Sequence, residues 1–237
     1  MVVETRDEVT RLRVPETGFV LGVRYGGNAH FDDGSKIPDL SLAGISRHAR
    51  TMRTSSNGAV LLARFHSASA ARIFGNRLHE FFGRTESLDA VFAHSELERL
   101  QSRVEEAASD SDRVATLESF LLRHTQRDPD ELVHFALSVL RSEPGMRIRE
   151  LARRLGLSHD AFEKRFRREV GCAPKQFVSL TRVHSVMNAY HSGASLTQLA
   201  LDAGYFDQPH FNREFRSVTG VSPGAYFGPR SEATSNR

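Results

Sequence analysis

Apolar residues in the C-terminal part of the chain recur at the three- and four-residue steps of helices that bury one face. A first pair of such stretches is separated by Gly156 and a second pair by Gly204. Glycine enters the left-handed conformation that ends a helix at little cost, so each pair predicts two helices joined by a tight turn. The predicted inner-face positions are Ile148, Leu151, Ala152, Leu155, Phe162, Phe166 and Val170, then Leu196, Leu199, Ala200, Ala203, Phe211, Phe215 and Val218.

The two pairs are copies of one pattern. Residues 151–156 correspond to residues 199–204 at a shift of 48, and the following aromatic pairs correspond at a shift of 49. A Gly-x-x-Pro segment follows each pair, at 171–174 and 220–223. Because leucines, glycines, aromatics and prolines recur in the same order, the sequence predicts two helix-turn-helix units, at about 147–170 and 195–218.

The segment between the units has the helical apolar spacing from residue 175 to 191 and no Gly/Ser linker. It predicts one amphipathic helix that holds the units rigidly. Further helices are predicted at 68–82, 95–108, 112–125 and 130–142.

The first 66 residues have a β-rich pattern instead. Strands are predicted at 19–23 and 59–65, with turns at 26–28 and 32–34. The fold class is therefore α+β, with a β-rich and partly helical N-terminal domain followed by an all-α domain. The predicted N-terminal domain spans 1–127, β-rich over 1–66 and helical over 67–127. The predicted all-α domain spans 130–229, and 230–237 are predicted to form a flexible tail.

Composition narrows the class. Apolar residues make up 39% and charged residues 26%, as in ordinary globular proteins, and no apolar run is long enough to span a bilayer. The first residues carry acidic groups where a signal peptide needs a basic start, and Cys172 is the single cysteine. We therefore expect a cytoplasmic protein that does not interact with membranes.

Charge is divided unevenly along the chain. From residue 144 onward there are 14 Lys and Arg against 8 Asp and Glu, whereas the preceding part has 18 against 21. A basic half joined to a slightly acidic half indicates that the C-terminal half binds a polyanion.

The outer faces of the second helix in each unit carry side chains of the types that read DNA. Arg and Lys donate to guanine, Asn and Gln pair with adenine, and arginines further along a helix contact phosphates. Two units held rigidly are expected to read successive major grooves, about 34 Å apart. The candidate contacts are His159, Asp160, Glu163, Lys164, Arg167 and Arg168 in the first unit, and Gln208, His210, Asn212, Arg213 and Arg216 in the second.

Residues 204–216, followed by the Thr-Gly-Val-Ser-Pro of 219–223 and by Tyr226, resemble the signature of the AraC/XylS family of transcription regulators. The resemblance extends over about 130–229. It implies a DNA-binding domain of about seven helices with two recognition helices. It also implies binding near promoters, most often activating transcription through contact with RNA polymerase.

Three positions depart from the family pattern. Phe206 stands where a small polar residue is common, Arg165 stands where an apolar residue is common, and Asp160 with Glu163 places carboxylates on the first reading face. Asp207 and Pro209 still suit the first turn of a helix. Carboxylates accept from cytosine but repel phosphates, so the first unit is expected to bind selectively or weakly.

Residues 40–122 resemble the degenerate half-cupin domains found on some of these regulators, with a partial sheet or one completed by a partner chain. By this analogy the N-terminal domain binds a small effector, forms homodimers, or both. His30, His48 and His66 lie eighteen residues apart, unlike the short spacing of a metal site, and no phosphate-binding loop or nucleophile elbow is present. Neither a metal nor another cofactor is predicted.

The sequence therefore predicts a transcription regulator that binds double-stranded promoter DNA and is controlled by a small effector. The alternatives are a constitutive regulator whose N-terminal domain only dimerises, and a DNA-repair enzyme that carries this module. A pocket of several hundred Å³ with converging polar groups in the N-terminal domain would favour the effector-controlled regulator over the constitutive one. A repair enzyme would need a reactive cysteine or a metal cluster in the N-terminal half. That half has no cysteine and only scattered histidines, so a non-enzymatic protein is predicted.

Overall fold

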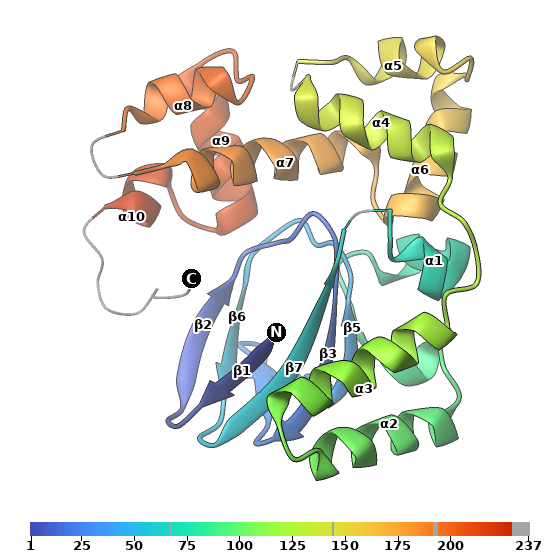
Figure 1. Cartoon of the computed structure of the whole chain (residues 1–237). Coiled ribbons are helices and arrows are strands. Elements are labelled where there is room, and N and C mark those ends of the chain that lie inside the picture. The colour runs from blue at the N-terminus through green and yellow to red at the C-terminus, as the bar shows by residue number, and fades with distance from the viewer. Residues whose placement is uncertain (67, 144, 192–193, 229–237) are drawn as a thin grey trace.

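The computed structural model describes residues 1–66, 68–143, 145–191 and 194–228. The predicted tail at 230–237 lies outside these residues. A β-rich half is followed by a helical half that lies across one end of the sheets (Figure 1). The α+β fold class is therefore confirmed.

In the part of the chain that the structure describes, eight strands form two antiparallel sheets, of order β1-β7-β3-β5-β8 and β2-β6-β4. The strands predicted at 19–23 and 59–65 are β3 and β7, paired along their length, with Phe19 opposite Phe65 and Val23 opposite Leu61. β8 lies beyond residue 66, so limiting the strands to 1–66 was wrong by this one short strand. The strands are β1 (Val2–Thr5), β2 (Val9–Arg13), β3 (Phe19–Gly26), β4 (Ala29–Phe31), β5 (Leu40–Ala43), β6 (Arg50–Thr54), β7 (Gly58–Phe65) and β8 (Thr85–Ser87).

Side chains alternate along β3 between two faces of the sheet, one packed in the main core and the other facing a cavity. Phe19, Leu21 and Val23 are fully buried in the main core, on the side that the helices cover. The alternate residues Val20, Gly22 and Arg24 face a cavity between the two sheets, because successive side chains of a strand point to opposite faces. Two sheets of the same chain thus line one interior space.

Helices follow the strands and cover the outer face of the larger sheet. The helix predicted at 68–82 is instead a short α-helix followed by a 3₁₀ helix, and the change occurs at Gly75, whose φ of 72° interrupts an α-helix. The predictions at 95–108 and 112–125 are confirmed to within two residues. These elements are α1 (Ala71–Phe74), η1 (Gly75–Phe81), η2 (Leu88–Ala90), α2 (His94–Glu106) and α3 (Asp110–Arg123).

The C-terminal half contains seven helices among the described residues, as the family resemblance implied. The long helix predicted at 175–191 is α7, which lies between the two helix pairs (Figure 1). The helices are α4 (Glu131–Ser142), α5 (Ile148–Arg154), α6 (His159–Val170), α7 (Pro174–Ala189), α8 (Leu196–Asp202), α9 (Gln208–Thr219) and α10 (Pro223–Phe227).

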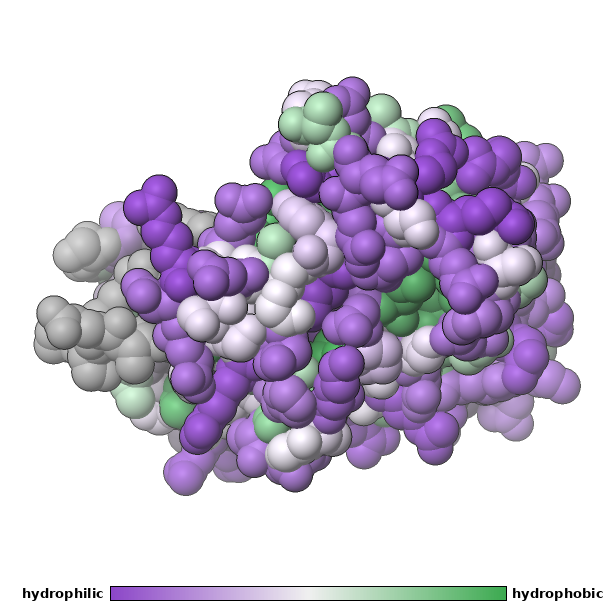
Figure 2. All heavy atoms as spheres, turned by 90° about the horizontal axis from the view of Figure 1, so that it is seen from below, coloured by the Kyte–Doolittle hydropathy of each residue, from purple (hydrophilic) through white to green (hydrophobic). Residues whose placement is uncertain are grey.

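One continuous cluster of buried apolar side chains runs through both halves of the molecule. The face remote from the helical half is covered mainly by hydrophilic side chains, with apolar groups confined to small areas (Figure 2). Within the described ranges, no helix is long and apolar enough to cross a membrane.

Candidate nucleic-acid interface and interior cavity

The two helix pairs α5–α6 and α8–α9 end their first helices with the same hydrogen bonds. In the first pair, the N–H groups of Gly156 and Leu157 donate to Arg153 and Ala152, at 3.1 and 2.9 Å. In the second pair, Gly204 and Tyr205 donate to Leu201 and Ala200, at 2.9 and 3.0 Å. Gly156 and Gly204 have φ of 69° and 82°, the left-handed geometry predicted for both. The repeat in the sequence is therefore a repeat in the structure.

The second helix of each pair also begins in the same way. The Ser158 hydroxyl accepts from the N–H of Ala161 at 3.2 Å, and the Asp207 carboxylate accepts from the N–H of His210 at 2.7 Å. Side chains that accept these end N–H groups fix where a helix starts. Phe162 and Phe166 in α6, and Phe211 and Phe215 in α9, are buried against the rest of their units.

The opposite faces of α6 and α9 are open to solvent. None of the eleven candidate DNA contacts is buried. His159, Glu163 and His210 are half-buried. The exposed ones are Asp160, Lys164, Arg167, Arg168, Gln208, Asn212, Arg213 and Arg216.

The acidic character of the first face is reduced by pairing within α6. Glu163 accepts from Arg167 at 2.6 Å, and its other oxygen lies 3.6 Å from Nε2 of His159. The carboxylate therefore has a cationic partner one turn away. Arg167, which the sequence analysis assigned to a phosphate, is engaged with Glu163 in this structure.

The second face is organised by Tyr205, which is buried behind it. Its hydroxyl donates to Glu214 at 2.8 Å, and its ring packs edge-on against His210 at 5.4 Å between centroids. Burial and the nearby Glu214 carboxylate raise the pKa of Tyr205, so the hydroxyl stays a donor. Glu214 also lies 3.7 Å from His210. These contacts hold His210 toward the body of the domain and leave Gln208, Asn212 and Arg213 outermost.

Arg165, another of the departures from the family pattern, lies on the edge of α6. Its Nε donates to Asp130 at 2.5 Å, and the same carboxylate caps α4 by accepting from Val133. Burial alone would raise the pKa of Asp130, but the hydrogen bonds from Arg165 and the backbone outweigh it and lower the pKa. Arg165, which stands where the family commonly has an apolar residue, thus joins α6 to α4.

The N-terminal half contacts the ends of both recognition-type helices. Nδ1 of His48 and the N–H of Ala49 donate to the last carbonyls of α9, on Ser217 and Val218, at 2.7 and 2.8 Å. At the end of α6, Gly171 lies against the ring of Phe19. His184 of α7 donates to the carbonyl of Pro15 at 2.6 Å, and Arg127 pairs with the buried Glu169. The two halves are therefore joined next to the helices that carry the candidate DNA contacts.

A cavity of about 340 Å³ lies between the two sheets. Its walls are alternate residues of β1, β3, β5, β6 and β7 together with consecutive residues of β2, and it extends to His184, Met187 and Tyr226 of the helical half. The charged side chains in its wall are four arginines and one glutamate: Arg11, Arg13, Arg24, Arg64 and Glu16. The cavity is therefore lined by both halves and is rich in cationic groups.

Arg24 is the least solvated of these arginines, with 5% of its surface exposed. Its Nε lies 3.7 Å from Asp39, too far for a hydrogen bond, and neither Nε nor Nη1 has a hydrogen-bond partner among the described residues. Burial lowers the pKa of this guanidinium, although Asp39 offsets part of the effect. Oδ1 of Asp39 likewise has no hydrogen-bond partner among the described residues, so the two groups form a long ion pair whose buried donors a further acceptor would satisfy.

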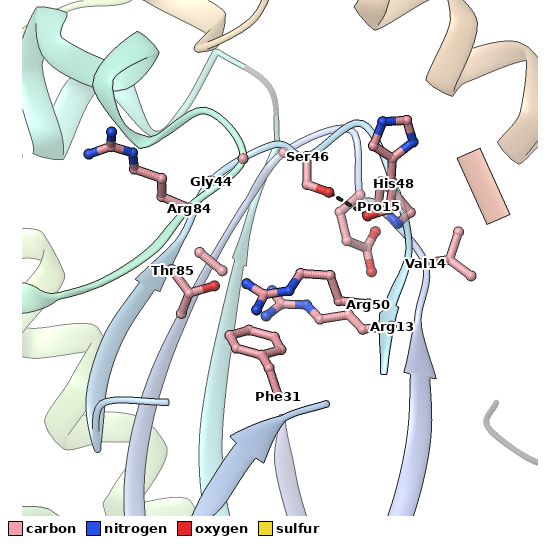
Figure 3. Close-up of a pocket in the computed structure, with 14 residues that line it drawn as sticks. Arg13, Val14, Pro15, Phe31, Gly44, Ser46, His48, Arg50, Arg84 and Thr85 are labelled. Atoms are coloured by element: carbon pink, nitrogen blue, oxygen red, sulfur yellow. Dashed lines mark hydrogen bonds between the residues drawn. The ribbon is translucent and has the colours of Figure 1, made fainter. Parts of the chain in front are cut away.

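A second group of cations lies at the end of the sheets that faces the helical half. Arg13 and Arg50 lie side by side over Phe31 (Figure 3), with Cζ of Arg50 at 3.4 Å from the ring centroid. Arg50 pairs with Asp33 at 2.7 Å. Burial lowers the pKa of Arg13, and Arg64 and Arg50 lower it further, against the opposing effect of Glu16. This end of the interior is therefore electropositive.

These interior residues were not predicted from the sequence. Residues 19–23 were predicted as a strand without a distinction between its two faces, and the alternation of Val20, Gly22 and Arg24 was the available signal. The described residues contain no group of three or more His, Cys, Asp or Glu that could hold a metal ion, so His30, His48 and His66 form no such group. Cys172 is 2% exposed, and burial raises the pKa of its thiol to about 12.

The repeated helix pairs, with polar outer faces on α6 and α9, define a tandem helix-turn-helix DNA-binding domain. A family model described as a helix-turn-helix domain matches residues 151–228. These residues form a helix-turn-helix domain of the AraC type, which confirms the resemblance read from the sequence.

An uncharacterized HTH-type transcriptional regulator of Staphylococcus aureus is 28% identical over 89 residues, which are 37% of this chain. The matched segment spans 12% of the length of that relative. Two crystal structures of ToxT from Vibrio cholerae, one of an apo variant, each align over 95% of both chains. Their TM-scores are 0.51 and 0.50 and their identities 13% and 14%, so the likeness is one of fold.

Proposed function

We propose that the chain is a transcription regulator that binds double-stranded promoter DNA with α6 and α9. The observation that supports this proposal is the duplicated geometry, in which two capped helices, each preceded by a glycine-ended helix, present polar faces to solvent. A recognition helix inserts its N-terminal residues into the major groove, so Gln208, Asn212 and Arg213 are the residues proposed to contact base edges. A cytoplasmic location is expected for a protein that binds chromosomal DNA in this way. Activation, contact with RNA polymerase and homodimer formation stay predictions from the resemblance.

The two exposed arginines of α9 test this assignment. Arg213→Ala is expected to relax base preference at one operator position and to weaken specific binding by about 1–3 kcal/mol. Arg216→Ala is expected to weaken binding to all sequences alike and to lower the salt dependence, because a phosphate contact carries no sequence information. Fluorescence anisotropy with the DNA upstream of the protein's own gene, over a range of salt concentrations, measures both.

The matched control is Arg103→Ala, which removes an exposed arginine from α2 in the N-terminal half. It is expected to bind DNA as the unmodified protein does. Wild-type affinity and selectivity in both α9 variants would refute the proposed face.

A second function, control by a small molecule, is favoured by the interior cavity. A regulator whose N-terminal half only dimerises has no need of an interior space, whereas this one has about 340 Å³ with converging arginines. The unpartnered donors of Arg24 favour an effector with an anionic group. The repair-enzyme alternative needs a reactive cysteine or a metal cluster. Among the described residues the free cysteine, Cys172, is buried, and no group of side chains that could hold a metal ion is present.

Thermal denaturation with a panel of monocarboxylates and phosphomonoesters tests the effector proposal. A ligand at about 100 times its Kd stabilises the folded chain by about 2.7 kcal/mol, and Arg24→Met is expected to abolish that shift. Arg84→Met, at an exposed arginine outside this cavity, is the control. Stabilisation of the Arg24→Met variant to the wild-type extent would exclude the arginine as the anchor.

A further inference from the structure

Phe206 has the greatest exposure of any large apolar side chain among the described residues, at 90%. It lies in the turn between α8 and α9, directly before Asp207, the residue that caps α9. Its neighbour Tyr205 is 3% exposed. The chain therefore directs one aromatic ring inward and the next one outward.

The backbone on both sides of Phe206 is held by hydrogen bonds. The N–H of Tyr205 donates to Ala200 at 3.0 Å on one side, and Asp207 caps the helix on the other. The exposed ring is therefore attached to a fixed turn rather than to a long loop.

An apolar residue directly before a helix cap usually packs against the fourth residue of the helix. In α9 that residue is Phe211, and the ring that packs on it is Tyr205, at 5.2 Å between centroids. Phe206, at 90% exposure, does not take this structural role. A single exposed apolar residue needs no special explanation by itself, so the informative feature is where Phe206 lies, at the start of α9.

The position of Phe206 identifies the partner. The residues at the start of a recognition helix meet the base edges, and Phe206 adjoins that start beside Gln208. Among groups in the major groove, the one suited to an apolar ring is the 5-methyl group of thymine. Resting on the proposed DNA binding by α9, we propose that Phe206 reads a thymine methyl group and thereby contributes to operator specificity.

Uracil interference is the direct test, because deoxyuridine lacks only that methyl group. Operator fragments with random dT→dU replacement are bound by the protein, separated into bound and free fractions, and the replaced positions are mapped. For the wild-type protein, replacement at one thymine next to the bases contacted by α9 is expected to reduce affinity about three- to fivefold, the effect of one buried methyl group. For Phe206→Ser the signal at that thymine is expected to vanish while the rest of the footprint persists.

Phe135→Ser is the matched control, since it removes a phenylalanine that is 54% exposed on α4. It is expected to leave the interference pattern unchanged, and thermal denaturation establishes that both variants are folded. An identical pattern for the wild type and Phe206→Ser would overturn the proposal. Failure of the wild-type protein to give any footprint on its own promoter would instead overturn the proposed DNA binding.

Discussion

Gly171 offers a sharp test of how the two halves of the molecule are joined. It ends α6 with φ of 86°, and a Cβ atom at this position would lie 2.6 Å from Cζ of Phe19 and 3.2 Å from the carbonyl oxygen of Leu78. The Phe19 ring is fully buried, so it cannot swing aside into solvent. Gly171→Ala therefore introduces both backbone strain and a steric clash.

Gly220 provides the matched control, because it ends α9 with φ of 81° and a Cβ atom there would meet no atom within 4 Å. Gly220→Ala introduces the left-handed strain alone, about 1–2 kcal/mol. Gly171→Ala adds overpacking of a filled interior, typically about 1–3 kcal/mol more. At roughly 2–4 °C for each kcal/mol in a chain of this size, its Tm is expected to fall several degrees below that of Gly220→Ala.

Urea denaturation followed by circular dichroism measures the free energy of unfolding of both variants. A second change, Phe19→Leu, replaces the ring with a smaller aliphatic side chain. It is expected to restore part of the stability lost in Gly171→Ala, but none of that lost in Gly220→Ala. If the two alanine variants agree to within about 0.5 kcal/mol, the close approach of α6 to the N-terminal sheet is not a tight contact and the reasoning is wrong.

Two further predictions concern titratable groups. The pKa of Asp130 is lowered in the folded protein, so its contribution to stability is present above its unfolded pKa of about 3.9 and is lost as the pH falls through the folded value. Asp130→Asn is therefore expected to be less stable than the wild type at pH 7, with the gap closing in acid, and a gap that is equally wide in acid would contradict this. The Cys172 thiol, buried and with its pKa raised to about 12, is expected to resist iodoacetamide in the native protein and to react in urea. Rapid alkylation without denaturant, measured by mass spectrometry, would show that the thiol is accessible.

The helical half could be predicted closely because its signals are local. Gly156 and Gly204 marked helix ends, and Ser158 and Asp207 lie at helix starts, where each needs only neighbouring residues to act. The exposed faces of α6 and α9 followed directly from the helical repeat. Whether Glu163 would be paired could not be read in the same way, because this depends on the side-chain conformations of His159 and Arg167.

The N-terminal half was predicted less completely because its structure depends on contacts between distant residues. β8 pairs with β5 across about forty residues, and its three residues show no alternation that could identify it alone. The cavity arises only when both sheets face one another, so Arg24 looks like an ordinary strand residue until the pairing is known. The contact of His48 with Ser217 joins residues 169 positions apart in the sequence, and no local sequence pattern predicts it.

The cavity also has a thermodynamic consequence, because part of its wall belongs to α7 and α10. A ligand that touches His184, Met187 or Tyr226 gains those contacts only while the two halves are docked. By reciprocity, the factor by which such a ligand favours docking equals the factor by which docking raises its affinity. A substitution at Gly171 that loosens the contact between the two halves would then lower the affinity for a ligand bound in the cavity. Saturating ligand would in turn restore part of the docking that the substitution weakens.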